Sequence, residues 1–264
     1  MRDKTQDDKQ NLQQTATEAV SEADTIEQDA PVVAAAPKRK LAGMQILAIF
    51  IIILALIMFA LPFVNSALIK RYSQLNLNAI TASELQRNQQ NDAHVAFEDI
   101  EEIGIINIWP WLNKYDRDNI VGLLNFPSLD IKLPIFNSAS NENLLAGVAT
   151  LKPEQKMGQG NYTISGHRAR GKGVLLHNLM DAEIGSVVKL SDKEKIYIYR
   201  VVDALQVENE AVHMLDDAQM EKYGNKPLLS IMTCHFGKST SRWFVIASLE
   251  EIVDYSDAEF NRPD

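Results

Sequence analysis

A single cysteine, Cys234, lies between two apolar segments near the end of the 264-residue chain. Leu228–Met232 and Trp243–Ala247 are rich in residues that favour β-strands, and the stretch between them is rich in Gly, Lys, Ser and Thr. The pattern predicts a strand, a loop and a second strand. Cys234 is then at the exit of the first strand and Arg242 at the start of the second. An antiparallel hairpin would let these two side chains face each other.

A cysteine attacks as its thiolate, and an ordinary thiol is only about 3 per cent ionised at neutral pH. A nearby base or cation must therefore raise the reactive fraction. Among the five histidines, His167 has the best setting for a base, because Asn161–Ser165 predicts a strand with His167 at its exit. His235 adjoins the cysteine, but neighbours on an extended chain point to opposite faces. The remaining histidines lie in predicted helix, loop or linker segments: His94, His177 and His213.

Arg242 and Thr233 would complete such a site. A guanidinium carries five donors and suits a thiolate or an oxyanion, and Thr233 offers a hydroxyl or a backbone donor. Residue type alone favours a different outcome for Cys234, a buried and inert thiol. A zinc site is a further alternative, but it needs several ligands at short spacing and the chain has no CxxC or HxxxH pattern. No metal is therefore predicted.

The elements that position these residues belong to one predicted domain over residues 94–255. Short β-rich segments dominate it, helical signals are few, and strands and helices do not alternate regularly. We therefore expect a mainly β fold, a largely antiparallel barrel or sandwich, and strand closure favours the barrel. The predicted strands are Ile103–Ile108, Ile120–Phe126, Ile131–Phe136, Asn161–Ser165, Ser186–Leu190, Lys195–Val207, Leu228–Thr233 and Trp243–Glu251; the predicted helices are Asn141–Ala146, Leu175–Met180 and Asp216–Tyr223.

An apolar segment, Leu41–Val64, precedes this domain. As a helix it would be about 36 Å long, enough to cross a hydrocarbon core of about 30 Å. A buried core helix would carry a polar face, and a cleaved signal peptide would be shorter and closer to the N-terminus. We therefore predict a single-pass membrane anchor. Basic residues at 38–40 and 70–71 favour a cytoplasmic N-terminus only weakly.

The remaining segments are predicted from composition. Residues 1–40 form a disordered cytoplasmic tail, because residues 1–37 are acidic and lack aromatic side chains. Residues 65–93 form a stalk and linker with an amphipathic helix over Ser66–Arg87, and residues 256–264 form a C-terminal tail. The net charge of −9 and the pI near 5.1 argue against a nucleic-acid binder. A lone cysteine also excludes a disulfide within the chain.

Three segments, Asn161–Arg168, Ser230–Cys234 and Ser241–Trp243, resemble in order the signature segments of the sortases, the membrane-anchored cysteine transpeptidases of Gram-positive bacteria. The resemblance covers about residues 119–252 and includes Leu133–Phe136, which is similar to the family's Leu-Pro-Ile-Tyr strand. The departures from the family's signature segments are mild. Ser and Ile replace Thr and Leu at the start of the cysteine segment, and Ser165 replaces a frequent alanine.

This resemblance implies an eight-stranded β-barrel and a two-step acyl transfer. His167 corresponds to the family's histidine, Cys234 to its nucleophile, Arg242 to its arginine and Thr233 to the threonine implicated in the oxyanion hole. The enzyme would cleave the Thr–Gly bond of LPxTG-type signals on surface proteins. It would transfer the acyl group to an amine of a cell-wall precursor such as lipid II, with hydrolysis as a side reaction. The substrate requires a catalytic domain outside the cell.

Within the family, the sequence favours the housekeeping class A. The pilin-polymerising class carries an Asp-Pro-aromatic lid and a second span, whereas Trp109–Trp111 lacks the Asp and no apolar span follows Ile252. Some class A members use calcium, but no ligand set can be matched, so no cofactor is predicted. Other hypotheses are a papain-like hydrolase, whose Cys precedes its His, a caspase-like protease, whose Gln-Ala-Cys signature is missing, and a membrane-tethered peptide-binding domain.

Overall fold

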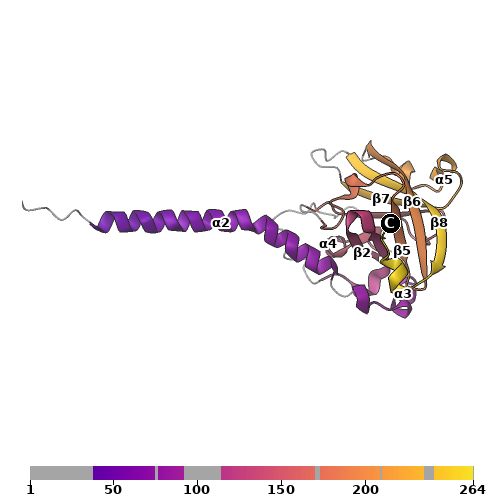
Figure 1. Ribbon diagram of the computed structural model, residues 1–264, viewed down its shortest axis with the longest axis horizontal. Coiled ribbons are helices and arrows are strands. Elements are labelled where there is room, and N and C mark those ends of the chain that lie inside the picture. Colours follow the sequence, from indigo (N-terminus) through magenta and orange to yellow (C-terminus); the bar gives the residue numbers. More distant parts are fainter. Residues whose placement is uncertain are drawn as a thin grey trace, which may run out of the picture. The chain divides into compact units, whose positions relative to one another are not determined.

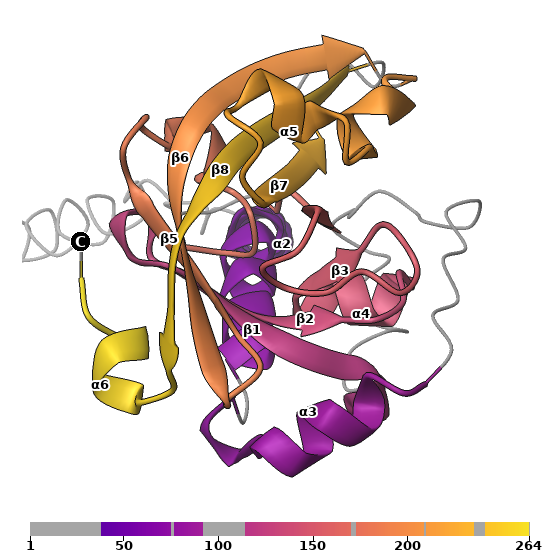
Figure 2. The ribbon, with the colours of Figure 1, turned by 90° about the vertical axis from the view of Figure 1, so that its right-hand side faces the viewer.

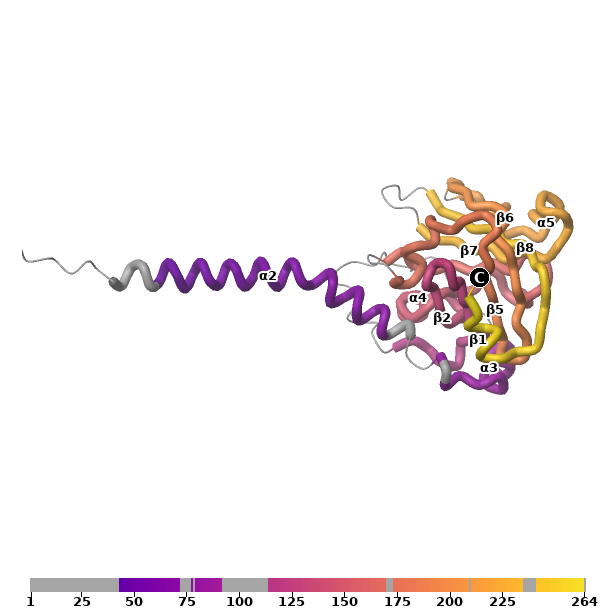
Figure 3. The backbone as a smooth tube through the Cα atoms, in the orientation of Figure 1, coloured from indigo at the N-terminus to yellow at the C-terminus, as the bar shows by residue number. Residues whose placement is uncertain are grey.

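The computed structural model describes residues 38–74, 77–91, 114–169, 173–208, 210–234 and 241–263 (Figures 1 and 3). The chain divides into two units, residues 1–55 and 56–264. Residues 1–37 of the predicted disordered tail (residues 1–40) and the predicted strand Ile103–Ile108 lie outside the described residues, whereas residues 38–40 begin a helix.

Helix α2 (Lys38–Gln74) contains the predicted membrane span. The segment Gly43–Arg71 is long and apolar enough to cross a membrane, with a mean hydropathy of 3.1 in its most apolar stretch. Large apolar side chains along residues 44–59 are exposed, as suits contact with lipid. The helix continues through Pro62, whose carbonyl accepts a hydrogen bond from the Ser66 hydroxyl at 2.8 Å.

Among the described residues, eight strands form a closed barrel in the order β1-β2-β3-β4-β7-β8-β6-β5, which confirms the predicted fold (Figure 2). Neighbours are antiparallel except for the parallel pairs β2–β3 and β4–β7. The three-residue strand β3 was not predicted, because so short a segment shows no periodicity. The strands are β1 (Ile120–Phe126), β2 (Ile131–Phe136), β3 (Val148–Thr150), β4 (Asn161–Gly166), β5 (Val187–Ser191), β6 (Lys195–Glu208), β7 (Leu228–Cys234) and β8 (Ser241–Asp254).

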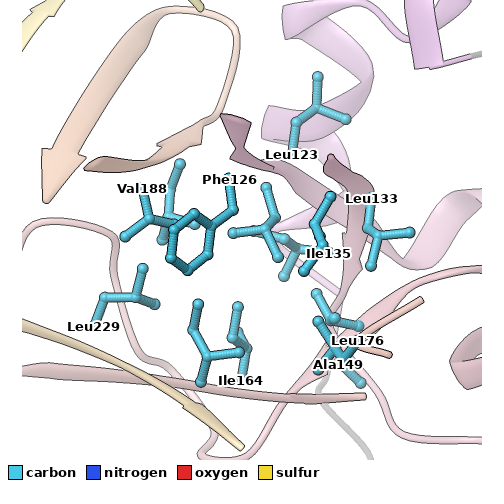
Figure 4. Packing of buried hydrophobic residues seen from close by; sticks show 14 of the residues in the cluster. Leu123, Phe126, Leu133, Ile135, Ala149, Ile164, Leu176, Val188 and Leu229 are labelled. Carbon is cyan, nitrogen blue, oxygen red and sulfur yellow. The ribbon is translucent and has the colours of Figure 1, made fainter. Parts of the chain in front are cut away.

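The barrel interior is filled by alternate residues of these strands. Phe126, Ile135, Ile164 and Leu229 point into this interior and are fully buried (Figure 4). Close packing of this kind supplies most of the stability of a barrel and fixes which face of each strand points outward.

Apart from α2, the described helices outside the barrel are short. The prediction for Asn141–Ala146 is confirmed as α4. The predicted helix Leu175–Met180 is wrong, because Leu175 has φ +48° and pairs with Arg168 in an isolated bridge. The segment predicted as helix Asp216–Tyr223 is helical only in part. The remaining helices are α3 (Ala82–Asn88), α5 (Gln219–Lys222) and α6 (Asp257–Phe260), with 3-10 turns η1 (Leu77–Ala79), η2 (Arg117–Asn119), η3 (Pro127–Leu129), η4 (Leu179–Asp181) and η5 (Val212–Leu215).

The predicted continuous helix over Ser66–Arg87 is also wrong. Thr81 is extended and caps a new helix, α3, through a reciprocal pair of hydrogen bonds with Glu84. Leu85 of this helix is fully buried in the barrel core. The Asn88 amide donates to the backbone carbonyls of Arg117 and Ile120 at 3.0 and 2.9 Å. The described residues 77–91 therefore pack on the barrel rather than extending away from it as a free linker.

Part of the predicted C-terminal tail is also packed against the barrel. Helix α6 ends in Phe260, which is 1% exposed. The Asn125 amide of β1 donates to the Phe260 carbonyl. The Lys189 ammonium of β5, itself buried, donates to the carbonyls of Glu259 at 2.7 Å and Arg262 at 3.1 Å. We call Asn125, Lys189 and residues 257–262 the C-terminal anchor.

Candidate active site

Strand β7 lies between β4 and β8 and ends at Cys234. Leu229 and Ile231 of β7 belong to the core inside the barrel, whereas Leu228 and Met232 belong to a second apolar cluster on the opposite, outer face. The alternation of side chains along a strand places Cys234 on this outer face as well. Its thiol is exposed and unpaired by any disulfide. The alternative of a buried, inert cysteine is therefore wrong.

Arg242 is the register partner of Cys234 across the antiparallel pair β7–β8. Directly opposite residues on one face of such a pair have Cβ atoms about 5 Å apart. The predicted juxtaposition in the hairpin is thus confirmed. Arg242 is half-buried, and its Nη1 donates to the Ser241 carbonyl at 3.3 Å. This arrangement places a permanent cation on the strand beside the thiol.

His167 follows β4, which pairs with β7 in parallel from Asn161↔Leu228 to Ser165↔Met232. Continuing the same register by two residues brings His167 level with Cys234, on the side opposite Arg242. The imidazole is 9% exposed, and this burial lowers its pKa from 6.5 to about 4. At neutral pH the side chain is therefore uncharged and able to accept a proton.

The Thr233 hydroxyl connects the two strands that carry His167 and Cys234. It is buried and donates to the Gly166 carbonyl at 2.9 Å. Because the hydroxyl proton is used in this hydrogen bond, the hydroxyl links the two strands. Gly166 also has a steric reason to be glycine, because a Cβ there would lie 2.9 Å from side-chain carbons of Leu176 and Val148. We call His167, Thr233, Cys234 and Arg242 the cysteine edge.

Of the other predicted candidate histidines, two lie in the described part of the chain. His177 contacts the Ala169 carbonyl through Nδ1 at 2.7 Å, and His213 lies in η5. His94 and His235 lie outside the described residues. Within the described part of the chain, no group of three or more His, Cys, Asp or Glu side chains could hold a metal ion.

One segment beside the site was not predicted from the sequence, the connection that covers the outer face. The connection between β6 and β7, described over residues 210–227, packs Met214 and neighbouring side chains onto Leu228, Phe244 and Ile246. The sequence does contain a signal that this face is covered. Phe244 to Ala247 of β8 are all apolar, and a strand that is apolar on both faces is covered on both faces.

Comparisons with known proteins agree with the geometry. Residues 124–250 match the family model "Sortase domain". The chain is 28% identical over 207 residues to sortase A of Listeria monocytogenes, covering 78% of this chain and 90% of that protein. It is 30% identical over 104 residues to a Bacillus subtilis protein named as a sortase, YwpE, covering 39% of this chain and 94% of the other. The crystal structure of sortase C-3 from Streptococcus pneumoniae has the same fold, with a TM-score of 0.53 at 20% identity over 72% of this chain and 95% of that one.

Proposed function

Because this chain belongs to the sortase family of transpeptidases, we propose that it is a class A enzyme that cleaves LPxTG-type sorting signals between Thr and Gly. It transfers the resulting acyl group to an amine of a cell-wall precursor such as lipid II. The observation that carries the proposal is the register of three strands, which aligns an exposed thiol with a neutral imidazole on one side and a guanidinium on the other.

In the first step, the Cys234 sulfur attacks the carbonyl carbon of the signal's Thr as His167 takes the thiol proton. The tetrahedral intermediate carries a negative oxygen, which the Arg242 guanidinium stabilises by charge and hydrogen bonding. When the C–N bond breaks, His167 gives its proton to the departing amine of Gly. Because burial lowers the pKa of His167, its imidazole is neutral before attack and, once protonated, readily releases the proton it has gained.

In the second step, the acceptor amine attacks the thioester carbonyl. His167 removes a proton from the attacking nitrogen, the C–S bond breaks, and the cysteine regains its proton. A new amide bond thus replaces the one that was cleaved, with no net oxidation or reduction. Water attacking the same thioester would give hydrolysis as the side reaction. Thr233 contributes by holding Gly166, and therefore the start of the His167 segment, against β7.

The class and the location are supported by the relatives and by the apolar helix. The similar proteins named sortase A include those from Listeria monocytogenes, Bacillus anthracis and Streptococcus agalactiae. The apolar segment of α2 would anchor the chain in the cell membrane as a single-pass protein. A substrate on the outer surface requires the N-terminus to be cytoplasmic and the barrel to be extracellular. LPxTG-bearing surface proteins, the precursor and the membrane are then its partners.

The full chain in detergent micelles, incubated with an LPxTG peptide and an amine nucleophile, tests the proposal. Mass spectrometry should detect cleavage between Thr and Gly, a ligated product, and a thioester adduct on Cys234. No cleavage by the wild type, combined with equal peptide binding by wild type and Cys234→Ala, would instead identify a peptide-binding domain.

A further inference from the structure

The connection between β6 and β7 crosses the outer face of the sheet that ends in Cys234. Its turn η5 buries Met214, and the apolar side chains around it cover Leu228, Phe244 and Ile246. Met232, the next outer residue of β7 before Cys234, is only half-buried. The connection therefore covers part of the outer face on which Met232 and Cys234 lie.

Asn161 of β4 fastens the connection to the sheet. The side chain is 1% exposed, and its amide nitrogen donates to the carbonyls of Met214 at 3.0 Å and Asp216 at 3.3 Å. Its amide oxygen accepts a hydrogen bond from the Ser230 hydroxyl of β7 at 2.7 Å. One side chain thus connects β4, β7 and the segment that lies over them, with both donors and the acceptor in use.

Asp217 completes this attachment. One carboxylate oxygen accepts from the Asn161 backbone N–H at 2.9 Å and from the Lys152 ammonium at 2.8 Å. These hydrogen bonds, the one from Lys152 first, hold the pKa of Asp217 below its ordinary value. Gly160 provides the space, since a Cβ there would lie 2.7 Å from the carboxylate and its φ is +56°.

The opposite side of the connection is held to β6. The Tyr223 hydroxyl donates to the Asp203 carboxylate at 2.6 Å, and Lys222 lies 3.5 Å from the same oxygen. The connection is therefore fixed on both sides of β7, at β4 on one side and at β6 on the other. Only the attachment at Asn161 lies on β4, the strand that leads to His167 about 20 Å further on.

We propose that Asn161 is a positioning residue for the acyl donor. By holding the β6–β7 connection against β4 and β7, it sets the opening beside Met232 and Cys234 through which an extended peptide reaches the thiol. Asn161 lies too far from Cys234 to contact the reacting atoms, so its effect is on peptide binding rather than on the chemical step. This inference rests on the transpeptidase function proposed above.

Asn161→Ala in the full chain, in detergent micelles, tests the proposal, with Asn125→Ala as the matched control. Both variants remove a buried strand asparagine that donates to a backbone carbonyl of a packed segment. Asn161→Ala should raise KM for the LPxTG peptide about tenfold and change kcat less than about threefold, the signature of lost binding. Asn125→Ala should leave KM unchanged. Asp217→Asn, which removes the charge paired with Lys152, should raise KM by less than Asn161→Ala does.

Hydrogen–deuterium exchange gives a readout that needs no turnover. Exchange should increase over residues 210–227 in Asn161→Ala and over residues 257–263 in Asn125→Ala. Unchanged exchange over 210–227 would overturn the inference whether or not the enzyme is active. Equal KM changes in the two variants, or a fall in kcat alone, would overturn it while leaving the proposed function intact. A wild type that does not process the peptide would overturn the proposed function and the acyl-donor role together.

Discussion

Two regions of the barrel bury polar side chains for different purposes, the cysteine edge and the C-terminal anchor. At the anchor, Asn125 and Lys189 donate to backbone carbonyls of the final segment. At the cysteine edge, Thr233 donates to the Gly166 carbonyl and Arg242 to the Ser241 carbonyl, while the neighbouring thiol is exposed and the imidazole is neutral. Buried donors that are paired with carbonyls stabilise a fold, whereas reactive groups must remain open to a substrate. The following variants test that contrast.

Cys234→Ala should produce the largest change in activity. Removing the nucleophile should lower transpeptidation on the order of 10⁴-fold or more, because no other group can form the thioester. The exposed thiol contributes little packing, so the free energy of unfolding should stay within about 0.5 kcal/mol of the wild type. Product formation by mass spectrometry and urea unfolding measure the two effects. Residual activity within tenfold of wild type would contradict the assignment of the nucleophile.

Arg242→Lys should lower kcat by about 10²–10³-fold, the usual effect of losing an oxyanion donor. A lysine retains the charge but cannot reproduce the geometry of the guanidinium. Arg200→Lys is the control, because Arg200 on β6 makes a two-point contact with Glu250 at 2.7 and 2.9 Å. Single-turnover formation of the thioester should fall only in the first variant. Near wild-type kcat in Arg242→Lys would remove Arg242 from the mechanism.

Acidification should destabilise the wild type through His167. The folded state lowers the pKa of this imidazole from 6.5 to about 4, so between these values the unfolded state binds more protons. The resulting contribution of His167 to the free energy of unfolding is about 3 kcal/mol. It is fully present above pH 6.5 and is lost as the pH falls toward 4. His167→Asn should show a shallower decline in the free energy of unfolding between pH 7 and pH 4. Parallel curves for the two proteins would show that His167 is not buried as described.

Lys189→Met should have the smallest effect on activity, and it should lower stability instead. It removes the donor that ties β5 to the carbonyls of Glu259 and Arg262 and should cost about 1–3 kcal/mol of unfolding free energy. The chemical step should be unaffected, because the anchor is not part of the cysteine edge. Lys195→Met is the control, since its ion pair with Asp254 is exposed and screened by solvent. A loss of kcat in Lys189→Met would break the distinction between the two regions.

Truncation must respect the packing of α3. A soluble fragment starting at residue 93 would lack Leu85, which is fully buried in the barrel core, and the Asn88 bonds to η2 and β1. Burial of one leucine is worth about 2–5 kcal/mol when it is truncated to alanine. The intact chain is therefore the appropriate material for all of these measurements.

Much of the site could be predicted because its decisive features are local. The hairpin of β7 and β8 places Cys234 opposite Arg242, and an antiparallel register over a short loop follows from strand patterns and loop length. The apolar segment within α2 was equally clear, because length and composition alone decide whether a helix can cross a bilayer. The roles of the four residues of the cysteine edge remain predictions.

Other features depend on contacts between distant segments. The parallel pairing of β4 with β7 places the strand end that leads to His167 next to the strand end that carries Cys234, and no local pattern specifies which strands pair in parallel. The same holds for Asn161, a polar residue in a predicted strand whose three partners lie far along the chain. Amphipathic periodicity likewise could not show that residues 77–91 pack on the barrel.

The sequence by itself thus determined an apolar helix, a largely antiparallel β-domain and a thiol facing an arginine, because each depends on neighbouring residues and simple periodicity. Only the tertiary structure decided that the imidazole is buried and neutral, that Thr233 ties two strands together, and that the β6–β7 connection is fastened over the outer face. These properties arise from closure of the barrel, which brings segments far apart in the chain into contact and removes their polar groups from water.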